Sequence, residues 1–494
     1  MGEYGILSLL PSLLAILLAI WTKQVFISLL LGIWLGWMII KDFNFLDGTF
    51  ATIQALVDVF QDAGNTRTIM FAALVGALII LIQRSGGVQG FIKALTIYLQ
   101  RFEGKKTTSS RVVVQLLAWL TGVLIFVESS ISVLVVGTLY RPIFDKMGIS
   151  REKLAYIADS SSAPTSILIP FNGWGAFIMG LLVMEGFSDP FATMFKSMAY
   201  NFYPILALIL VVIIVLSKKD FGLMKRAEAR VRDEGKLVFD DSQPMMADEL
   251  TDIAVKDGLV PKAYNMVIPI LLMVALMPVM LAYTGWEVAI AERPNASFLT
   301  TIAYAIGKGS GSTSVLTAVL GSIVGTMIFY KAQGLLGIKE MVDLSLKGIS
   351  GMIPIALLML MAFAIGTVCK EMSTGQYVAE ITKAWLSPGL VPFLVFLISC
   401  FIAFSTGTSW GTFAIMIAIA VPMANTMGAN VYMTIAAALG GGVYGDHCSP
   451  ISDTTILSSM ASATDHIDHV KTQLPYASIA GGLALLMYFL LGIL

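Results

Sequence analysis

The sequence contains few charged residues, only three cysteines, and none of the common nucleotide-binding or metalloprotease motifs. Asp, Glu, Lys and Arg make up 13% of its 494 residues, against about 25% in a typical soluble domain. The formal net charge is −1, which excludes a basic nucleic-acid-binding surface. The three cysteines, Cys369, Cys400 and Cys448, are far apart and form no CxxC pair, so there is no disulfide framework. Walker, GxGxxG and HExxH motifs are absent, and we expect neither an enzyme nor a cofactor.

Apolar residues are abundant instead. They make up 57% of the chain, and the mean hydropathy is +0.83, which is typical of a multi-pass membrane protein. Because backbone polar groups must be satisfied within the bilayer, we expect an all-α fold. Ten apolar runs are long enough to span: Ile6–Trp21, Val25–Ile40, Thr68–Ile82, Leu154–Val183, Tyr200–Leu216, Tyr264–Tyr283, Val315–Tyr330, Met352–Val368, Tyr432–Met460 and Pro475–Ile493.

Two further apolar regions are interrupted by polar residues. Val112–Tyr140 contains Glu128-Ser129-Ser130, and Val391–Met423 contains a hydroxyl-rich stretch from Ser405 to Thr412. Each half is short for a full crossing, and neither polar centre contains Lys or Arg. We predict re-entrant hairpins with tips at mid-membrane; two tight full-span hairpins are the alternative. More polar helices, Gly87–Arg101 and Gly375–Trp385, precede them and are typical of interfacial helices.

The distribution of basic residues predicts the orientation. In this layout one side receives 24 Lys and Arg and the other 7, and the richer side is predicted to be cytoplasmic. Both termini then face outward, and the protein lies in the cytoplasmic (inner) membrane. The charged stretch 218–262 is expected to be a solvated cytoplasmic linker without chemistry, with a short helix at Lys225–Glu234.

The linker separates two similar halves, 1–217 and 263–494. A Leu-Gly-x-x-x-Gly-x-Met-Ile pattern occurs in each, beginning at Leu31 and at Leu320, and its small residues allow close helix packing. Pro164 and Pro450 are predicted to mark equivalent breaks in the spans 154–183 and 432–460. Because each half contains five spans, we predict inverted repeats with broken helices meeting near the midplane.

The stretch from Gly440 to Ser459, GGGVYGDHCSPISDTTILSS, is the most unusual in the chain. It places Asp446, His447 and Asp453 at bilayer depth, where an ionisable group costs at least about 2.5 kcal/mol. Its glycines and Pro450 predict an interrupted helix whose freed backbone lines a cavity or an ion. We interpret it as the discontinuous helix of a transporter, with the site at the Gly-rich break.

At these residues the chain resembles the NhaC family of sodium/proton antiporters, within the broader ion-transporter superfamily. The resemblance extends to ESSIS, ADSSSAPTS and STGTSWGTFAI. It implies inverted repeats, paired re-entrant hairpins, an elevator-type movement, and Na+ and H+ as partners besides the lipid bilayer. A homodimer through the scaffold is expected by the same analogy. The resemblance also leaves room for relatives that couple Na+ or H+ to malate, lactate or amino acids.

Sodium requires oxygen ligands, and a proton can compete for the same carboxylate. Four polar elements are predicted to converge, and the candidate ion-binding residues are Glu128, Ser129, Ser130, Asp159, Ser160, Ser161, Ser162, Thr406, Thr408, Ser409, Asp446, His447, Ser449, Ser452, Asp453 and Thr454. Asp446 and Asp453 are the predicted Na+ ligands. Asp446 is the predicted switching carboxylate, and Asp159 is its predicted repeat partner.

Structural roles remain open for several of these residues. Glu128 and Asp159 could cap helices, His447 could bond backbone or relay protons, and the hydroxyls could satisfy freed backbone. We expect His466 and His469 to lie on a solvated face. The hairpins and broken helices contain no Lys or Arg that would bind an organic anion. This favours Na+/H+ exchange over organic-solute transport, and an ion channel or an intramembrane hydrolase is disfavoured.

Overall fold

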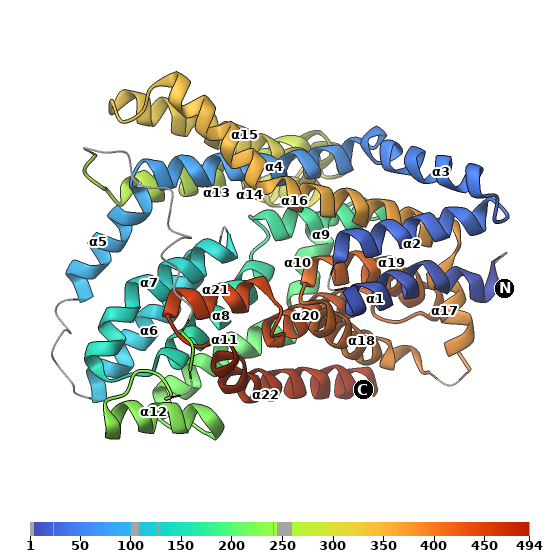
Figure 1. Ribbon diagram of the computed structural model, residues 1–494. Helices are drawn as coiled ribbons and strands as arrows, with labels where there is room; N and C mark the ends of the chain where they lie inside the picture. Colours follow the sequence, from blue (N-terminus) through green and yellow to red (C-terminus); the bar gives the residue numbers. More distant parts are fainter. Residues whose placement is uncertain are drawn as a thin grey trace.

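The computed structural model describes residues 4–22, 24–99, 108–126, 128–240, 242–244, 259–384 and 386–493. The regular structure in these ranges is helical throughout (Figure 1). The α-helices are α1 Leu10–Thr22, α2 Val25–Ile40, α3 Phe45–Asp58, α4 Ala63–Arg84, α5 Gly87–Leu99, α6 Thr108–Leu124, α7 Ser129–Met147, α8 Arg151–Leu168, α9 Gly173–Met184, α10 Pro190–Met198, α11 Phe202–Ser217, α12 Gly222–Glu234, α13 Tyr264–Glu292, α14 Phe298–Lys308, α15 Gly311–Ala332, α16 Ile338–Glu371, α17 Thr374–Thr382, α18 Val391–Thr406, α19 Ser409–Met427, α20 Val431–Cys448, α21 Asp453–Ser462 and α22 His466–Ile493.

Within the described residues, nine helices are long and apolar enough to cross a membrane. A tenth span results if α10 and α11, which meet at 45°, are taken together. The predicted all-α, multi-pass fold is confirmed. The predicted interfacial helices correspond to α5 and α17, and their last residues, 100–101 and 385, lie outside the described ranges.

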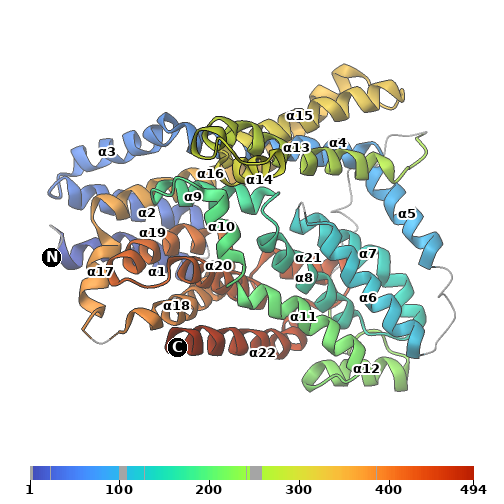
Figure 2. The same cartoon turned by 180° about the vertical axis from the view of Figure 1, so that it is seen from behind.

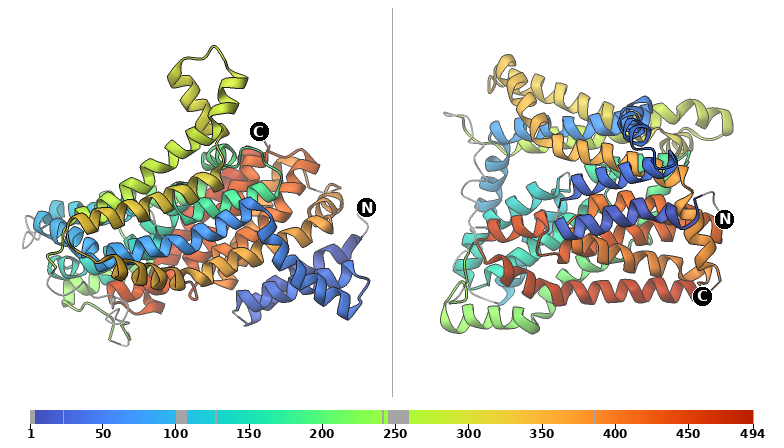
Figure 3. Two further views of the ribbon diagram at one scale, coloured as in Figure 1. Left: turned by 90° about the horizontal axis from the view of Figure 1, so that it is seen from above. Right: turned by 45° about the vertical axis from the view of Figure 1, so that its right-hand side comes forward.

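The helices pack in two main groups (Figures 1 and 3). One contains α4 and α13–α16, and the other contains the two hairpins and the broken helices. Glycines allow the closest approaches: a Cβ on Gly76 of α4 would lie 2.2 Å from the carbonyl oxygen of Gly348 in α16. A Cβ on Gly36 of α2 would lie 2.2 Å from Val368 of α16. These backbone contacts bring long helices together without large side chains between them.

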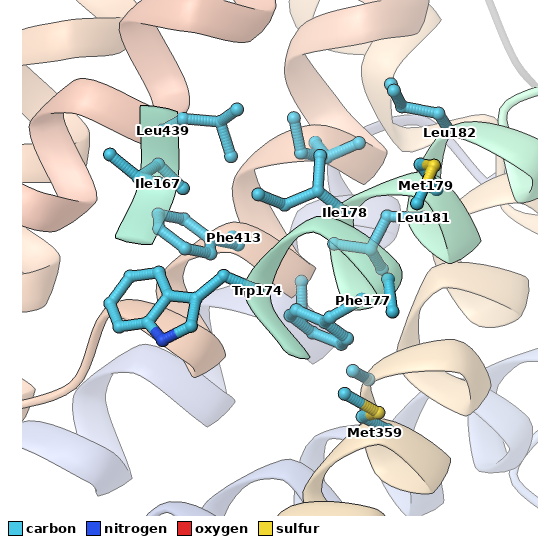
Figure 4. Packing of buried hydrophobic residues seen from close by; sticks show 14 of the residues in the cluster. Ile167, Trp174, Phe177, Ile178, Met179, Leu181, Leu182, Met359, Phe413 and Leu439 are labelled. Carbon is cyan, nitrogen blue, oxygen red and sulfur yellow. The ribbon is translucent and has the colours of Figure 1, made fainter. Parts of the chain in front are cut away.

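The two hairpins lie at opposite ends of the bundle. Figures 1 and 2 show α6–α7 at one end and α18–α19 at the other, where both chain termini also lie. Each hairpin packs against the second half of the broken helix from the other repeat. Trp174 of α9 contacts Trp410 of α19 with ring centroids 5.2 Å apart, and it lies beside Phe413 in Figure 4. Gly137 of α7 lies against Ala461 of α21.

The first helix break does not lie at Pro164 as predicted, and the second lies at Pro450 as predicted but beyond the glycines. α8 is continuous through Asp159 and Pro164 and ends at Leu168. α20 is continuous through its glycines and ends at Cys448. Instead, the glycines of α20 let α18 pack closely against it. A Cβ on Gly445 would lie 2.4 Å from the carbonyl oxygen of Cys400 in α18. The unwound segments are therefore 169–172 and 449–452.

Helix bounds also give a different repeat register. The bounds of α19 equal those of α7 shifted by 280 residues, and those of α20 equal those of α8 shifted by the same number. Pro450 then corresponds to Pro170 rather than to Pro164. Asp446 corresponds to Ser166, so Asp159 is not its repeat partner.

The linker is more ordered than predicted. Its helix α12 docks against the end of the bundle opposite the termini (Figure 1). Arg230 is buried and pairs with both carboxylate oxygens of Glu152 in α8, at 2.9 and 3.0 Å. Lys153 pairs with Asp220. The description of this region as merely solvated is wrong, because Arg230 of α12 and Asp220 just before it both pair with the first broken helix.

Candidate functional site

Asp446 lies in the last turn of α20, beside the tip of the second hairpin. Its Oδ2 accepts hydrogen bonds from the hydroxyl of Ser409 at 2.8 Å and from the Ser409 backbone N–H at 3.3 Å. Only 3% of Asp446 is exposed, and its Oδ1 has no hydrogen-bond partner among the described residues. One carboxylate oxygen is therefore fixed by the hairpin, and the other can contact a bound ion.

Asp453 and Glu128 lie near this carboxylate. Asp453 is the first residue of α21, is exposed, and accepts a hydrogen bond from the Thr454 N–H at 2.9 Å. Glu128 caps α7 by accepting from the Ile131 N–H at 2.8 Å, one of the two roles open to it. Asp453 interacts electrostatically with both Glu128 and Asp446. The second break thus places three acidic side chains in one electrostatic environment.

Asp159 forms the centre of a second buried cluster. It lies in the middle of α8 and is fully buried. Its Oδ2 accepts a 2.7 Å hydrogen bond from Gln473 Nε2 and a 3.4 Å bond from the Thr455 hydroxyl. The same oxygen lies 3.7 Å from Nε2 of His447 and 3.5 Å from Nε2 of His469. A capping role for Asp159 is wrong, because α8 begins at Arg151 and is capped by Ser150.

His447 connects this cluster to α11. Its Nδ1 lies 2.6 Å from the hydroxyl of Tyr203, and its Nε2 lies 3.2 Å from the hydroxyl of Ser160. His447 and Asp446 are neighbours in the last turn of α20. The two clusters are therefore adjacent along the chain, but their side chains have different partners.

Four of the eleven predicted hydroxyl residues bond backbone carbonyls. Ser161 and Ser162 donate within α8, Thr406 donates to Ile402, and Ser449 donates to Phe404 of the second hairpin at 2.7 Å. The remaining ones behave differently: Ser129 is buried at the start of α7, Ser130 donates to Glu128, Thr408 precedes α19, and Ser452 caps α21 beside Thr454.

Sequence reasoning missed three buried residues of the Asp159 cluster: Tyr203, His469 and Gln473. The expectation of a solvated face is wrong for His469, which is fully buried. His466 is partly buried and its Nε2 lies 2.6 Å from the carbonyl oxygen of Pro450. A signal existed, since His469 and Gln473 are four residues apart and share one helix face. Among the described residues no group of three or more His, Cys, Asp or Glu side chains is arranged to hold a metal ion.

Comparisons with known proteins show which family this chain resembles. The profile described as "Na+/H+ antiporter family" matches residues 176–493. An uncharacterized protein of Haemophilus influenzae is 30% identical over 496 residues, which cover 98% of this chain and 90% of the relative. A Bacillus subtilis protein named malate-2H(+)/Na(+)-lactate antiporter is 32% identical over 118 residues, 21% of this chain and 25% of that one.

A solved structure has a similar fold. The YdaH transporter of Alcanivorax borkumensis superposes with a TM-score of 0.57 at 15% identity, covering 90% of this chain and 88% of that one. Its reported topology is described as unusual. At this identity the likeness concerns the path of the chain and not the cargo.

Proposed function

The chain belongs to the Na+/H+ antiporter family, and from this premise we propose that it exchanges Na+ for H+ by alternating access. It is a multi-pass membrane protein, and the family consists of transporters rather than enzymes. We place it in the cytoplasmic membrane, with the α12 side facing the cytoplasm. The predicted resemblance to sodium/proton antiporters is confirmed at the level of the family.

The observation that carries the proposal is the environment of Asp446. Its Oδ2 is held by Ser409, and its buried Oδ1 has no hydrogen-bond partner among the described residues. A buried, unpaired carboxylate is costly in a membrane protein, and the cost falls when a cation or a proton binds. Na+ and H+ then compete for one group, which is the requirement for exchange. Asp453 and the carbonyl groups of the unwound segment 449–452 are the further Na+ ligands in this proposal.

Movement of the ion requires two conformations. The hairpins and broken helices form the moving domain in this proposal, and α1–α2 with α13–α15 form the scaffold. A homodimer through the scaffold accompanies this elevator mechanism. Cysteine crosslinking tests the assembly: pairs between scaffold positions of two protomers are expected, and a crosslink between the two Cys448 residues would contradict it.

Everted membrane vesicles containing a fluorescent pH probe test the transport reaction. After an acid-inside gradient is established, addition of NaCl alone is expected to dissipate it, and KCl at equal concentration is not. Vesicles without the protein give the background. A response that requires malate, lactate or an amino acid in addition to Na+ would overturn simple Na+/H+ exchange.

Exchange of an organic anion is the second candidate, and one relative's name supports it. The N-termini of α9 and α21 begin at the two breaks, and helix N-termini favour carboxylates. No Lys or Arg occurs within Val112–Tyr140, Leu154–Val183, Val391–Met423 or Tyr432–Met460. This absence favours the small cation, because organic carboxylates are commonly held by Arg or Lys.

A further inference from the structure

His469 has an unusual position for a histidine near the start of a helix. It lies in the first turn of α22, is fully buried, and has its Nε2 3.5 Å from Asp159 Oδ2. Neither ring nitrogen makes a hydrogen bond to any described residue. Buried imidazoles usually satisfy at least one nitrogen with a partner. The contact with Asp159 becomes strongly favourable only when the imidazole carries a proton.

We propose that His469 and Asp159 form a second proton-binding centre, in addition to the carboxylate Asp446 for which Na+ and H+ compete; this inference rests on the proposed exchange of Na+ for H+. The chemistry of the ligands distinguishes the two centres. Around Asp446 the neighbouring groups are a hydroxyl, a second carboxylate and backbone carbonyls, which suit a hard cation. Around Asp159 two imidazoles approach the same carboxylate oxygen, and imidazole nitrogen is a proton acceptor and a poor ligand for Na+.

The groups that face this centre determine how its charge is balanced. They come from every broken or packed helix around it and include one amide and several acidic or aromatic side chains. These are Tyr156 on α8, Tyr203 on α11, Asp446, His447 and Cys448 on α20, Asp453 and Thr455 on α21, and Gln473 on α22. None of them is a Lys or Arg, so a protonated histidine is the available countercharge for Asp159 in this set.

Gln473 connects the proton-binding centre to the sodium-binding end of α20. Its single Nε2 donates to Asp159 Oδ2 at 2.7 Å and to the carbonyl oxygen of His447 at 2.6 Å. That carbonyl is among the last of α20, where carbonyls lack partners within their own helix. It also belongs to the residue next to Asp446. A shift of the α20 end on Na+ binding would therefore be transmitted to Asp159, which makes Gln473 a positioning residue.

Histidine NMR tests the centre without requiring transport. The chain has three histidines, so the ¹⁵N ring signals of the purified, full-length protein can be assigned with His469→Asn and His447→Asn. If His469 binds a proton as proposed, its ring signals will change between the protonated and neutral forms as the pH is varied. Asp159→Asn should lower the fraction of protonated His469 at a given pH, shifting its midpoint by about one pH unit or more. His466 serves as the internal reference and should not shift.

Two results would overturn the proposal: His469 ring signals that do not change with pH, or a pH response that is unchanged in Asp159→Asn. Both readouts are independent of Na+ movement. If the wild-type protein moved no Na+, the proposed exchange would fail while the NMR result still decided whether His469 and Asp159 bind a proton.

Addition of Na+ tests the connection through Gln473. In the wild type, saturating Na+ is expected to shift the His469 midpoint, because two coupled sites affect each other reciprocally. Gln473→Leu should abolish that shift while His469 still titrates. Lys471→Gln, an exposed position on the same helix, is the matched control and should keep the shift. A Gln473→Leu protein with the full shift would show that the two centres are not connected by this side chain.

Transport measurements separate a proton-carrying role from a structural one. His469→Asn is expected to flatten the pH profile of exchange, while the KM for Na+ at alkaline pH stays within about twofold of wild type. A purely structural role predicts a uniform loss of rate at every pH. That outcome, with an unchanged pH profile, would also overturn the proposal.

Discussion

The two helix breaks have the same architecture and different chemistry. The first, 169–172, is closed by Asn172, whose Nδ2 donates to the carbonyl oxygens of Phe126 and Ser166 at 3.0 and 2.8 Å. The second, 449–452, is preceded by Asp446, whose carboxylate is held by Ser409 of the hairpin tip. In both, a polar side chain ties a broken helix to the hairpin of its own repeat. The first contact is neutral and the second is charged.

The repeat register makes this difference specific. With a shift of 280 residues, Ser166 is equivalent to Asp446, and Gly173 to Asp453. Each position therefore has a carboxylate in the second half only. A carboxylate at this depth costs several kcal/mol unless it is compensated, and in the proposed mechanism both Na+-binding carboxylates, Asp446 and Asp453, lie in the second half. The two halves therefore share a helix arrangement, but Asp446 and Asp453 have no acidic equivalent in the first half.

The largest expected effect comes from removing the charge at position 446. Asp446→Asn keeps the size of the side chain but cannot titrate or neutralise Na+. We expect exchange to fall to the background of vesicles without protein, with expression and folding unchanged. Na+-driven proton movement in proteoliposomes is the measurement.

Ser166→Ala at the equivalent position is the matched control and should retain most of the exchange activity. If the Asp446→Asn protein exchanged at the wild-type rate with the same Na+ and pH dependence, the asymmetry would have no functional meaning. Glu128 or Asp159 would then be the next carboxylate to test.

The second prediction concerns Asp453, which is exposed and makes a hydrogen bond only within its own helix turn. Asp453→Asn should raise the KM for Na+ and keep partial kcat, because the side chain supports the ion without holding it alone. Gly173→Ala is the control in the first half, where, among the described residues, an added Cβ would meet only the ring of Phe71, at 3.9 Å. If Asp453→Asn and Gly173→Ala changed the KM for Na+ equally, the two helix breaks would not differ in ion binding.

The third prediction concerns stability rather than affinity. Asn172→Ala removes the cap of α9 and two further hydrogen bonds, and we expect a loss of about 1–2 kcal/mol. The KM for Na+ should not change in the protein that remains folded. Thermal unfolding of the purified protein measures the first effect and proteoliposome transport the second. A raised KM without a loss of stability would place ion binding at the first break.

The smallest effect is expected for Ser452→Ala, at the position equivalent to Asn172. Ser452 caps α21 through a 3.5 Å contact with the Thr455 N–H, and water can replace one hydroxyl among several ion ligands. We expect less than about 1 kcal/mol in unfolding free energy and a small rise in the KM for Na+. Complete loss of exchange would make this hydroxyl, and not Asp446, the essential group.

Much of the fold follows from local features of the sequence. The apolar runs predict the spans, and the polar interruptions predict both hairpin tips, since Glu128 precedes α7 and Ser409 begins α19. The acidic residues near Pro450 predict the charged break. Composition and periodicity are sufficient here because the bilayer requires helices wherever the chain is apolar.

The exact break and the Asp159 cluster were decided by tertiary structure. Glycines that suggest unwinding are helical in α20, because α18 packs directly on their backbone. Asp159, His447 and His469 come from three different helices, α8, α20 and α22, and their spacing in the sequence does not indicate that they meet. The buried position of Arg230 in the linker likewise depends on its ion pair with Glu152 of α8. Such contacts depend on which helix faces meet, and local pattern does not contain that information.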